Sequence, residues 1–336
     1  MRTPQLVGLL SAALLPQVLA RSNMVPSNVR EFYNGLIRNK TCTNKLASGF
    51  QSTTGGAKTF SYCGDHLADH KVVYIQGTKG QLAAMDVDCD GAPQKSDEND
   101  GRCPRSSRRS NPTAFHDLVQ SYGKGIEDLD PYVHSFVVFG NDDDSADPDE
   151  PGSGGPGHPG HGGGGPGSGG PGGGGHGGGP GSGGHGGGGG GWGGDHGGGG
   201  HGRAIRDAAL TFDPKKYGIK PLSVMAVVCD NKMFFGVWGD TQSSDPPLVG
   251  AASLSLATAC YGRGVDIDEG HSAKDVLYIA FPGHEAVPGR DGAAWKAKTW
   301  TNFHESIAAL GDRLIQRIPG SGNWTRPPPY TTRAAE

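Results

Sequence analysis

Residues 223–240 are SVMAVVCDNKMFFGVWGD, two apolar runs on either side of a short polar pair. Valine and aromatic residues favour β-strands, and the Asp-Asn pair at 230–231 can turn the chain. We therefore predict a hairpin with strands over 223–229 and 232–238. Asp240 then follows the second strand, a place where rigid scaffolds commonly carry functional groups. From this pattern alone, a turn aspartate that caps the hairpin is favoured over a catalytic one.

Other segments extend the same α+β pattern along the chain. Apolar residues at helical spacing predict helices over residues 27–39, 114–122, 250–261 and 300–318. Short apolar runs predict strands over residues 72–76, 81–88, 133–139 and 276–281. Gly77–Gly80 is typical of a hairpin turn between the first two of these strands, and Asn28 with Glu31 resembles a capping box. We expect a single compact β-rich domain with peripheral helices, and a barrel-like closure of the sheet is left open.

The composition changes abruptly in the middle of the chain. The 336 residues include 61 glycines and 24 prolines, and most of the excess glycine lies in 151–202, after an acidic run at 142–150. Such a segment cannot bury apolar surface, which predicts disorder. We expect one domain, 21–141 and 203–318, split by an insertion at 142–202 and followed by a flexible tail at 319–336. Loop closure costs grow slowly with length, so such an insertion is tolerable.

Histidines in the insertion offer an alternative role for it, as a binder of Zn, Cu or Ni. They are His158, His161, His176, His185, His196 and His201. Ordering a flexible tract around a metal is costly, so a spacer is favoured and we expect no metal or other cofactor.

The first twenty residues predict a secretory signal peptide, residues 1–20, with a basic start, a ten-residue apolar run and small residues before the cleavage point. A buried N-terminal helix is the less favoured alternative. No other stretch is apolar enough to span a bilayer, so we expect a secreted monomer with no membrane contact. The even number of cysteines then indicates disulfides, with about fifteen possible pairings: Cys42, Cys63, Cys89, Cys103, Cys229 and Cys260. Glycosylation sequons begin at Asn39 and Asn323.

Charge narrows the choice of partner. The formal net charge is −4 at pH 7, which disfavours nucleic acid and is compatible with a cationic ligand. Asp86, Asp88 and Asp90 alternate, so on a strand they share one face and could bind Ca²⁺ or a cationic sugar. A calcium loop would need a glutamate at its twelfth position, where Asp97 stands. A solvated or disulfide-flanked turn is therefore favoured over a metal site.

Short motifs in a fixed order carry a stronger signal. They are Thr59–Asp65, Met85–Gly91, Gln120–Gly123, Phe212–Gly218, Pro221–Asn231, Gly236–Thr241, Ser253–Cys260 and Gly270–Phe281. Together they resemble the fungal chitosanases of glycoside hydrolase family 75. The resemblance implies hydrolysis of internal bonds in chitosan, a polymer of β-1,4-linked glucosamine, by an inverting mechanism that uses two carboxylates.

The resemblance also assigns positions to those carboxylates. One is the Asp of the Gly-Val-Trp-Gly-Asp motif, Asp240; the other is the Glu of a Gly-Glu-Ala-Ser motif, a position occupied here by Ala251. We expect Ala251 in the first turn of a helix, where the dipole favours an ionised carboxylate. The missing group would then be the base, and Asp240 the acid. Asp245 is the nearest substitute in the sequence.

Three functions follow as hypotheses. The first is an endo-chitosanase with Asp240 catalytic. Trp238, Asp86, Asp88 and Asp90 would bind the substrate, since a tryptophan face can stack on a pyranose ring. The second is an inactive relative that still binds chitosan. The third is a structural role in which the glycine-rich insertion tethers the protein.

Overall fold

The computed structural model describes residues 23–40, 42–93, 97–103, 111–141, 210–242, 247–318 and 320. The segments that we expect to form the signal peptide and the insertion lie outside these ranges, as does the expected tail apart from Gly320.

One sheet contains nine strands. They are β1 (Lys45–Phe50), β2 (Phe60–Cys63), β3 (Val73–Gly77), β4 (Ala83–Asp88), β5 (Phe136–Val138), β6 (Val224–Cys229), β7 (Lys232–Asp240), β8 (Ala251–Ser253) and β9 (His271–Ala280). The α-helices of the described residues are α1 (Ser27–Asn39), α2 (Leu67–His70), α3 (His116–Ser121), α4 (Leu254–Tyr261) and α5 (Trp300–Ile315). Short 3₁₀ helices are η1 (Thr78–Gly80), η3 (Pro214–Tyr217) and η4 (His284–Ala286).

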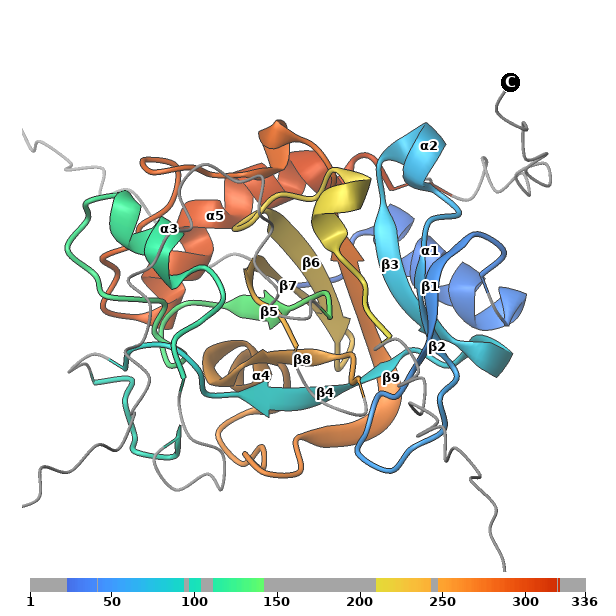
Figure 1. Ribbon diagram of the computed structural model, residues 1–336, viewed down its shortest axis with the longest axis horizontal. Coiled ribbons are helices and arrows are strands. Elements are labelled where there is room, and N and C mark those ends of the chain that lie inside the picture. The colour runs from blue at the N-terminus through green and yellow to red at the C-terminus, as the bar shows by residue number, and fades with distance from the viewer. Residues whose placement is uncertain are drawn as a thin grey trace, which may run out of the picture. The chain divides into compact units, whose positions relative to one another are not determined.

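Strands from both sides of the insertion build this sheet, which confirms the single α+β domain (Figure 1). The pairings run β9–β4–β8–β5–β7–β6 and return to β9, while β3, β2 and β1 extend from β9. The closure that the sequence left open is thus a ring of strand pairings rather than a barrel of all nine strands. Within the ring, β5, which precedes the insertion, pairs with β7 and β8, which follow it.

The hairpin of residues 223–240 is confirmed. β6 and β7 pair antiparallel, and Cys229 is aligned with Lys232 across the turn. Asp230 and Asn231 have φ angles of 45° and 57°, the left-handed conformation that a two-residue hairpin turn requires at both positions.

The predicted hairpin at Gly77–Gly80 is wrong, because β9 lies between β3 and β4 in the sheet. The turn packs against α1 instead: the Gly80 N–H donates to the Lys40 carbonyl oxygen at 2.7 Å. A Cβ at Gly80 would stand 2.1 Å from the Ile37 carbonyl oxygen, so only glycine fits this close approach.

Two details of the predicted helices are also wrong. The expected capping box is absent, since the Asn28 side chain donates to the carbonyl oxygens of Ile315 and Ile318 at the end of α5. The helix predicted from residue 250 begins at Leu254, because the preceding residues pair as β8 with β4 on one side and β5 on the other. The Ser253 side chain caps α4 by accepting from the Leu256 N–H.

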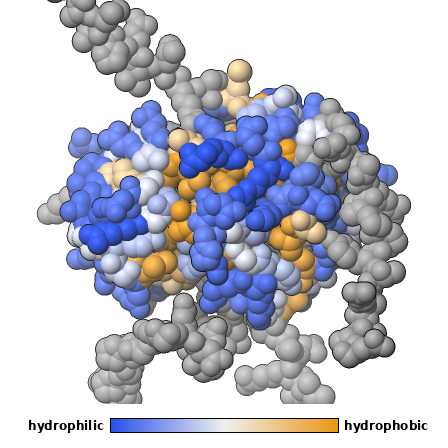
Figure 2. Space-filling model, turned by 90° about the horizontal axis from the view of Figure 1, so that it is seen from above, coloured by the Kyte–Doolittle hydropathy of each residue, from blue (hydrophilic) through white to orange (hydrophobic). Residues whose placement is uncertain are grey.

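Helix α5 covers strands β6 and β7, and it supplies much of the core on that side. Phe303, Ile307 and Leu314 are buried along one stripe of the helix, as the sequence predicts. Gly311 lets α5 approach the sheet, because a Cβ there would lie 2.4 Å from the Phe235 ring. The face seen in Figure 2 is mostly polar, with apolar patches between the polar side chains. No helix within the described ranges is long and apolar enough to cross a membrane.

The six cysteines form three disulfides between consecutive pairs: Cys42–Cys63, Cys89–Cys103 and Cys229–Cys260. Cys229–Cys260 joins the end of β6 to α4, and Cys89–Cys103 closes the loop that follows β4.

The two ends of the insertion are held together by backbone hydrogen bonds. Asn141 and Phe212 exchange both N–H···O bonds at 2.9 Å. The hydroxyl of Tyr62 donates to the Asn141 Oδ1 at 2.9 Å, and its ring stacks on Phe212 with centroids 3.8 Å apart. Residues 141 and 212, which flank the insertion, are therefore held next to each other.

Candidate active site

Three carboxyl groups meet where β4 and β7 end. Asp88 is the last residue of β4, Asp240 is the last residue of β7, and Asp90 follows two residues after β4. One oxygen of each carboxyl lies within 4.8 Å of the other two. We call these residues the acidic cluster. The sequence pattern predicted that Asp86 would line one face with Asp88 and Asp90, but the structure brings only the latter two to Asp240.

Asp240 is the buried member of the acidic cluster, with 5% of its surface exposed. Its Oδ1 accepts hydrogen bonds from the backbone N–H groups of Ala114 and Thr241, both at 2.8 Å. Burial raises the pKa of Asp240 well above its ordinary value, and the charges of Asp88 and Asp90 raise it further, while the two hydrogen bonds lower it by less. The carboxyl therefore favours its protonated form.

A β-bulge in β7 directly precedes Asp240. In the pairing of β5 with β7, Val137 is aligned with Trp238 but Val138 is aligned with Asp240, so Gly239 is the extra residue. A Cβ on Gly239 would lie 2.6 Å from side-chain atoms of Leu129 and Phe136. The bulge therefore requires glycine. Because of the bulge, Trp238 and Asp240 are aligned with the adjacent residues Val137 and Val138 of β5.

The burial of Trp238 overturns the stacking role that we expected for it. Its side chain is 1% exposed, so neither ring face is open to a sugar. The indole Nε1 donates to the Asp240 carbonyl oxygen at 2.9 Å, and the ring packs edge-to-face on Phe115. Trp238 thus fixes the backbone beside Asp240.

The segment 111–115 is a part of the site that the sequence did not reveal. Ala114 donates to Asp240, and the Asn111 N–H donates to the Asp90 Oδ1 at 2.8 Å. The segment is held by Asp128, which is 2% exposed and accepts from both the N–H and the hydroxyl of Thr113. Backbone donors of this kind have no signature in side-chain patterns.

Ala251 lies in β8, not in the first turn of a helix as expected. In register it is aligned with Asp86 of β4 and with Val138 of β5, and Val138 is in turn aligned with Asp240. Ala251 and Asp240 thus stand two strands apart in one row across the sheet. Strands are ~4.8 Å apart, which places the two backbones roughly 10 Å from each other. The helix-dipole argument for the role of this position no longer applies.

Among the described residues, the remaining acids form no second cluster of three. Asp245 lies outside the described residues. Asp266, Asp268 and Glu269 are exposed on the turn before β9, where Asp266 Oδ1 accepts from the other two backbone N–H groups. Within the described ranges, only the acidic cluster brings three potential metal ligands together.

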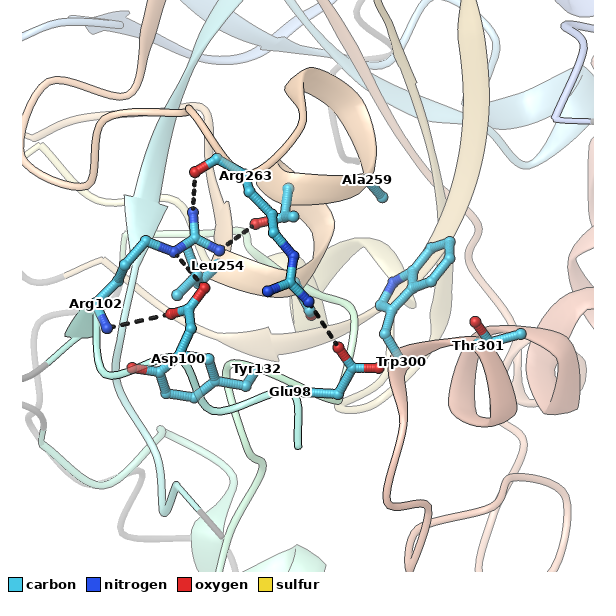
Figure 3. Close-up of a pocket in the computed structure, with 11 residues that line it drawn as sticks. Glu98, Asp100, Arg102, Tyr132, Leu254, Ala259, Arg263, Trp300 and Thr301 are labelled. Carbon is cyan, nitrogen blue, oxygen red and sulfur yellow. Dashed lines mark hydrogen bonds and ion pairs between the residues drawn. The ribbon is translucent and has the colours of Figure 1, made fainter. Parts of the chain in front are cut away.

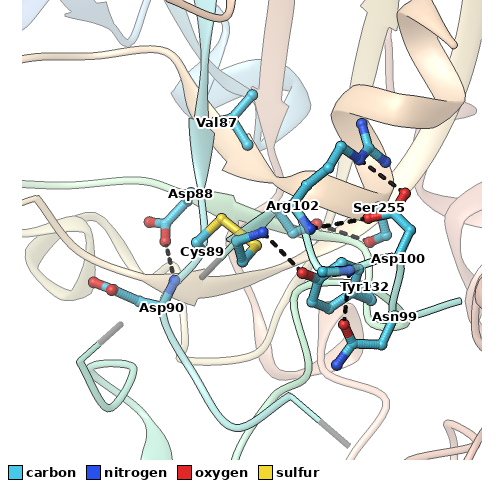
Figure 4. Close-up of a disulfide and its surroundings, with 12 residues drawn as sticks. Val87, Asp88, Cys89, Asp90, Asn99, Asp100, Arg102, Tyr132 and Ser255 are labelled. Carbon is cyan, nitrogen blue, oxygen red and sulfur yellow. Dashed lines mark hydrogen bonds and ion pairs between the residues drawn. A yellow bond between two sulfur atoms is a disulfide. The ribbon is translucent and has the colours of Figure 1, made fainter. Parts of the chain in front are cut away.

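The disulfide Cys89–Cys103 separates the acidic cluster from a second group of polar residues (Figure 4). Asp88 and Asp90 lie on one side of it, and Asp100, Arg102 and Tyr132 lie on the other. The Tyr132 hydroxyl accepts from the Cys103 N–H at 2.8 Å, which helps to fix the loop after β4.

Comparison with known proteins agrees with the motifs. The family model described as fungal chitosanase of glycosyl hydrolase group 75 matches residues 85–155 and 200–317. An endo-chitosanase of Aspergillus oryzae is 34% identical over 295 residues, which is 87% of this chain and 90% of that protein. An endo-chitosanase of Aspergillus fumigatus is 31% identical over 315 residues, 93% of this chain and 98% of that protein. No solved structure gives a significant match. The chain therefore belongs to the fungal chitosanases of glycosyl hydrolase group 75.

Proposed function

We propose that the chain is a secreted endo-chitosanase, a glycoside hydrolase that cuts internal β-1,4 linkages of chitosan with Asp240 as the general acid. The relatives, matched over 90% or more of their length, are named endo-chitosanases. Three disulfides support secretion, because such bonds persist in oxidising compartments. The observation that carries the proposal is the buried Asp240 carboxyl beside Asp88 and Asp90.

A general acid must hold a proton until the glycosidic oxygen takes it. Asp240 suits this role because burial and two neighbouring carboxylates oppose its ionisation. Both backbone donors reach Oδ1, so the proton belongs on Oδ2. Asp88 and Asp90, which are less buried, attract the ammonium groups of a glucosamine chain, and Asp86 adds to the same negative charge.

An inverting hydrolase also needs a base about 6.5–9.5 Å from the acid, to leave room for the attacking water. A glutamate at position 251 would start roughly 10 Å from the Asp240 backbone and could reach that separation. Alanine cannot activate water. Asp88 is too close to serve, since its oxygen lies within 4.8 Å of that of Asp240. Asp86, one strand beyond Ala251, is farther away.

We therefore expect slow hydrolysis in which water is weakly activated. A general base contributes typically 10²–10⁴-fold, so Ala251→Glu should raise the rate of chitosan cleavage by about that factor. The same alanine favours the second candidate, a relative that binds chitosan without cutting it. Asp245, nearest in sequence, stays a candidate substitute.

The test is release of reducing ends from soluble chitosan at mildly acidic pH. The protein is compared with Ala251→Glu, with Asp245→Asn and with Asp240→Asn, all shown to be folded by circular dichroism. Activity that survives in Asp240→Asn would refute the acid role. Equal activity of the unaltered protein and Ala251→Glu would mean that another carboxylate is the base. Chitosan binding without cleavage in either protein would establish the binding-only alternative.

A further inference from the structure

A pocket of about 270 Å³ lies beside α4, across the Cys89–Cys103 disulfide from the acidic cluster (Figure 3). The loop 97–103 forms one wall, α4 and the residue that follows its C-cap form another, and the first residues of α5 form a third. We call it the α4 pocket. Its size is just below the ~300–1,000 Å³ of typical ligand sites, which suits one sugar ring.

The charged groups of the α4 pocket are already paired. The Arg102 Nε donates to Asp100 at 2.9 Å, and its two other nitrogens donate to the Thr258 hydroxyl and the Arg263 carbonyl oxygen. The Arg263 guanidinium lies 4.0 Å from Glu98. Two arginines thus balance two carboxylates. An incoming ammonium group would have to compete with an arginine for either carboxylate, so the pocket favours an uncharged ligand.

Trp300 supplies a hydrogen-bond donor to the same pocket. Its indole Nε1 is buried and has no hydrogen-bond partner among the described residues. The ring is held in place by His304, stacked at 4.8 Å, and by the edge of Phe234. Figure 3 shows the nitrogen edge of the indole turned toward the Arg263 guanidinium. Trp300 and Arg263 thus bring two hydrogen-bond donors to the lining of the same pocket, and a buried donor without an acceptor is costly.

Leu254 and Ala259 line the pocket as apolar groups. A ligand that matches all these features has a carbonyl oxygen for the two donors, a small methyl group for the apolar side chains, and no positive charge. An acetamido group has all three properties. A free amino sugar has none of them, because its nitrogen is a cationic donor at mildly acidic pH.

We propose that the α4 pocket binds an N-acetylglucosamine unit, with the acetyl carbonyl accepting from Trp300 and Arg263 and the methyl group against Leu254 and Ala259. The choice of polysaccharide rests on the proposed function: the acidic cluster would take glucosamine units, and the α4 pocket an acetylated unit of the same or another chain. The protein would thus read the acetylation of its substrate at a site separate from the scissile bond.

The test is a titration of the full ¹⁵N-labelled protein followed by NMR of the tryptophan indole N–H signals. The probes are N,N′-diacetylchitobiose and its fully deacetylated counterpart, which share the same linkage and length. Trp300→Phe identifies the Trp300 signal by its disappearance. We expect the acetylated disaccharide to shift that signal saturably, and the deacetylated one to bind at least tenfold more weakly. Equal binding of the two sugars, or a Trp300 signal that does not move, would overturn the proposal.

Variants separate this site from the proposed active site. Trp300→Phe keeps an aromatic ring but loses the donor, and Arg263→Ala removes an exposed side chain without disturbing the core; each should weaken binding of the acetylated disaccharide about fivefold, as loss of one hydrogen bond implies. Asp240→Asn is the matched control and should leave this binding unchanged. Loss of binding in Asp240→Asn with no effect of the other two would place the sugar at the acidic cluster and refute the proposal. Because no turnover is required, the result is independent of whether the protein cleaves chitosan.

Discussion

Replacing Asp240 with asparagine should change how the stability of the protein depends on pH. In the folded protein, burial and the charges of Asp88 and Asp90 raise the pKa of Asp240 well above its ordinary value, whereas in the unfolded chain it is about 3.9. Between these two values the folded state binds more protons than the unfolded state. The stabilising contribution is therefore complete below the unfolded pKa, and it is lost as pH rises through the folded pKa.

The size of the effect follows from one proton. A single group that is protonated only in the folded state gives a slope of at most about 1.4 kcal/mol of unfolding free energy per pH unit. Asp240 carries this proton in the folded state, so replacing its carboxyl group by an amide removes the slope. At acidic pH the unfolding free energy of Asp240→Asn should be close to that of the unaltered protein. As pH rises toward neutral, the unfolding free energy of Asp240→Asn should increase relative to that of the unaltered protein.

The assay is urea unfolding followed by tryptophan fluorescence across the acidic to neutral range. Asp117→Asn serves as control. Asp117 lies in helix α3, and its side chain is 93% exposed. The control should keep the slope of the unaltered protein. Parallel stability curves for the unaltered protein and Asp240→Asn would refute the reasoning, because Asp240 would then ionise alike in both states and could not hold a proton for catalysis.

Three further predictions concern the fold. Tyr62→Phe removes a buried hydroxyl that bonds to Asn141, and it should lower the unfolding free energy by ~2 kcal/mol; a change within error in urea titrations would contradict this. Replacing Cys229 and Cys260 together by serine opens a loop with a sequence separation of 31 and should cost about 4 kcal/mol; unchanged thermal stability would argue against it. Burial lowers the pKa of His134 to about 4, so its imidazole should stay neutral from pH ~6.5 down to that value. Stability should fall across that interval because the unfolded chain takes up the proton first; an NMR titration of His134 near its ordinary pKa would contradict the prediction.

Local features of the sequence predicted the parts of the fold that depend on neighbouring residues. The turn at Asp230-Asn231 and the apolar stripe of α5 are examples, since a few adjacent side chains determine each. The wrong predictions concern segments whose structure depends on strands that are distant in the sequence. β9 separates β3 from β4, and residues 251–253 become a strand because β4 and β5 flank them. Nothing within either segment encodes those neighbours.

The candidate site divides in the same way. Asp240 could be placed at a strand end from the sequence, and the family resemblance suggested Ala251 as the position of a second carboxylate. Asp240 lies beside Asp88 only because the ring of strands brings the ends of β4 and β7 together, and the bulge at Gly239 lies against Leu129 and Phe136. Both are properties of the assembled sheet, so an alternating pattern along one strand could not reveal them.

The paired hydrogen bonds between Asn141 and Phe212 make the region between them a convenient place to graft other sequences. Once its ends are joined, a flexible loop costs only about 0.6 kcal/mol more for each doubling of its length. The sequence between these two residues can therefore be lengthened, shortened or exchanged, for example for a cellulose-binding module or an affinity tag, while its ends stay joined. The carboxyl groups at the ends of β4 and β7 would keep their geometry, because the hydrogen bonds between Asn141 and Phe212 hold the two ends of the exchanged sequence together.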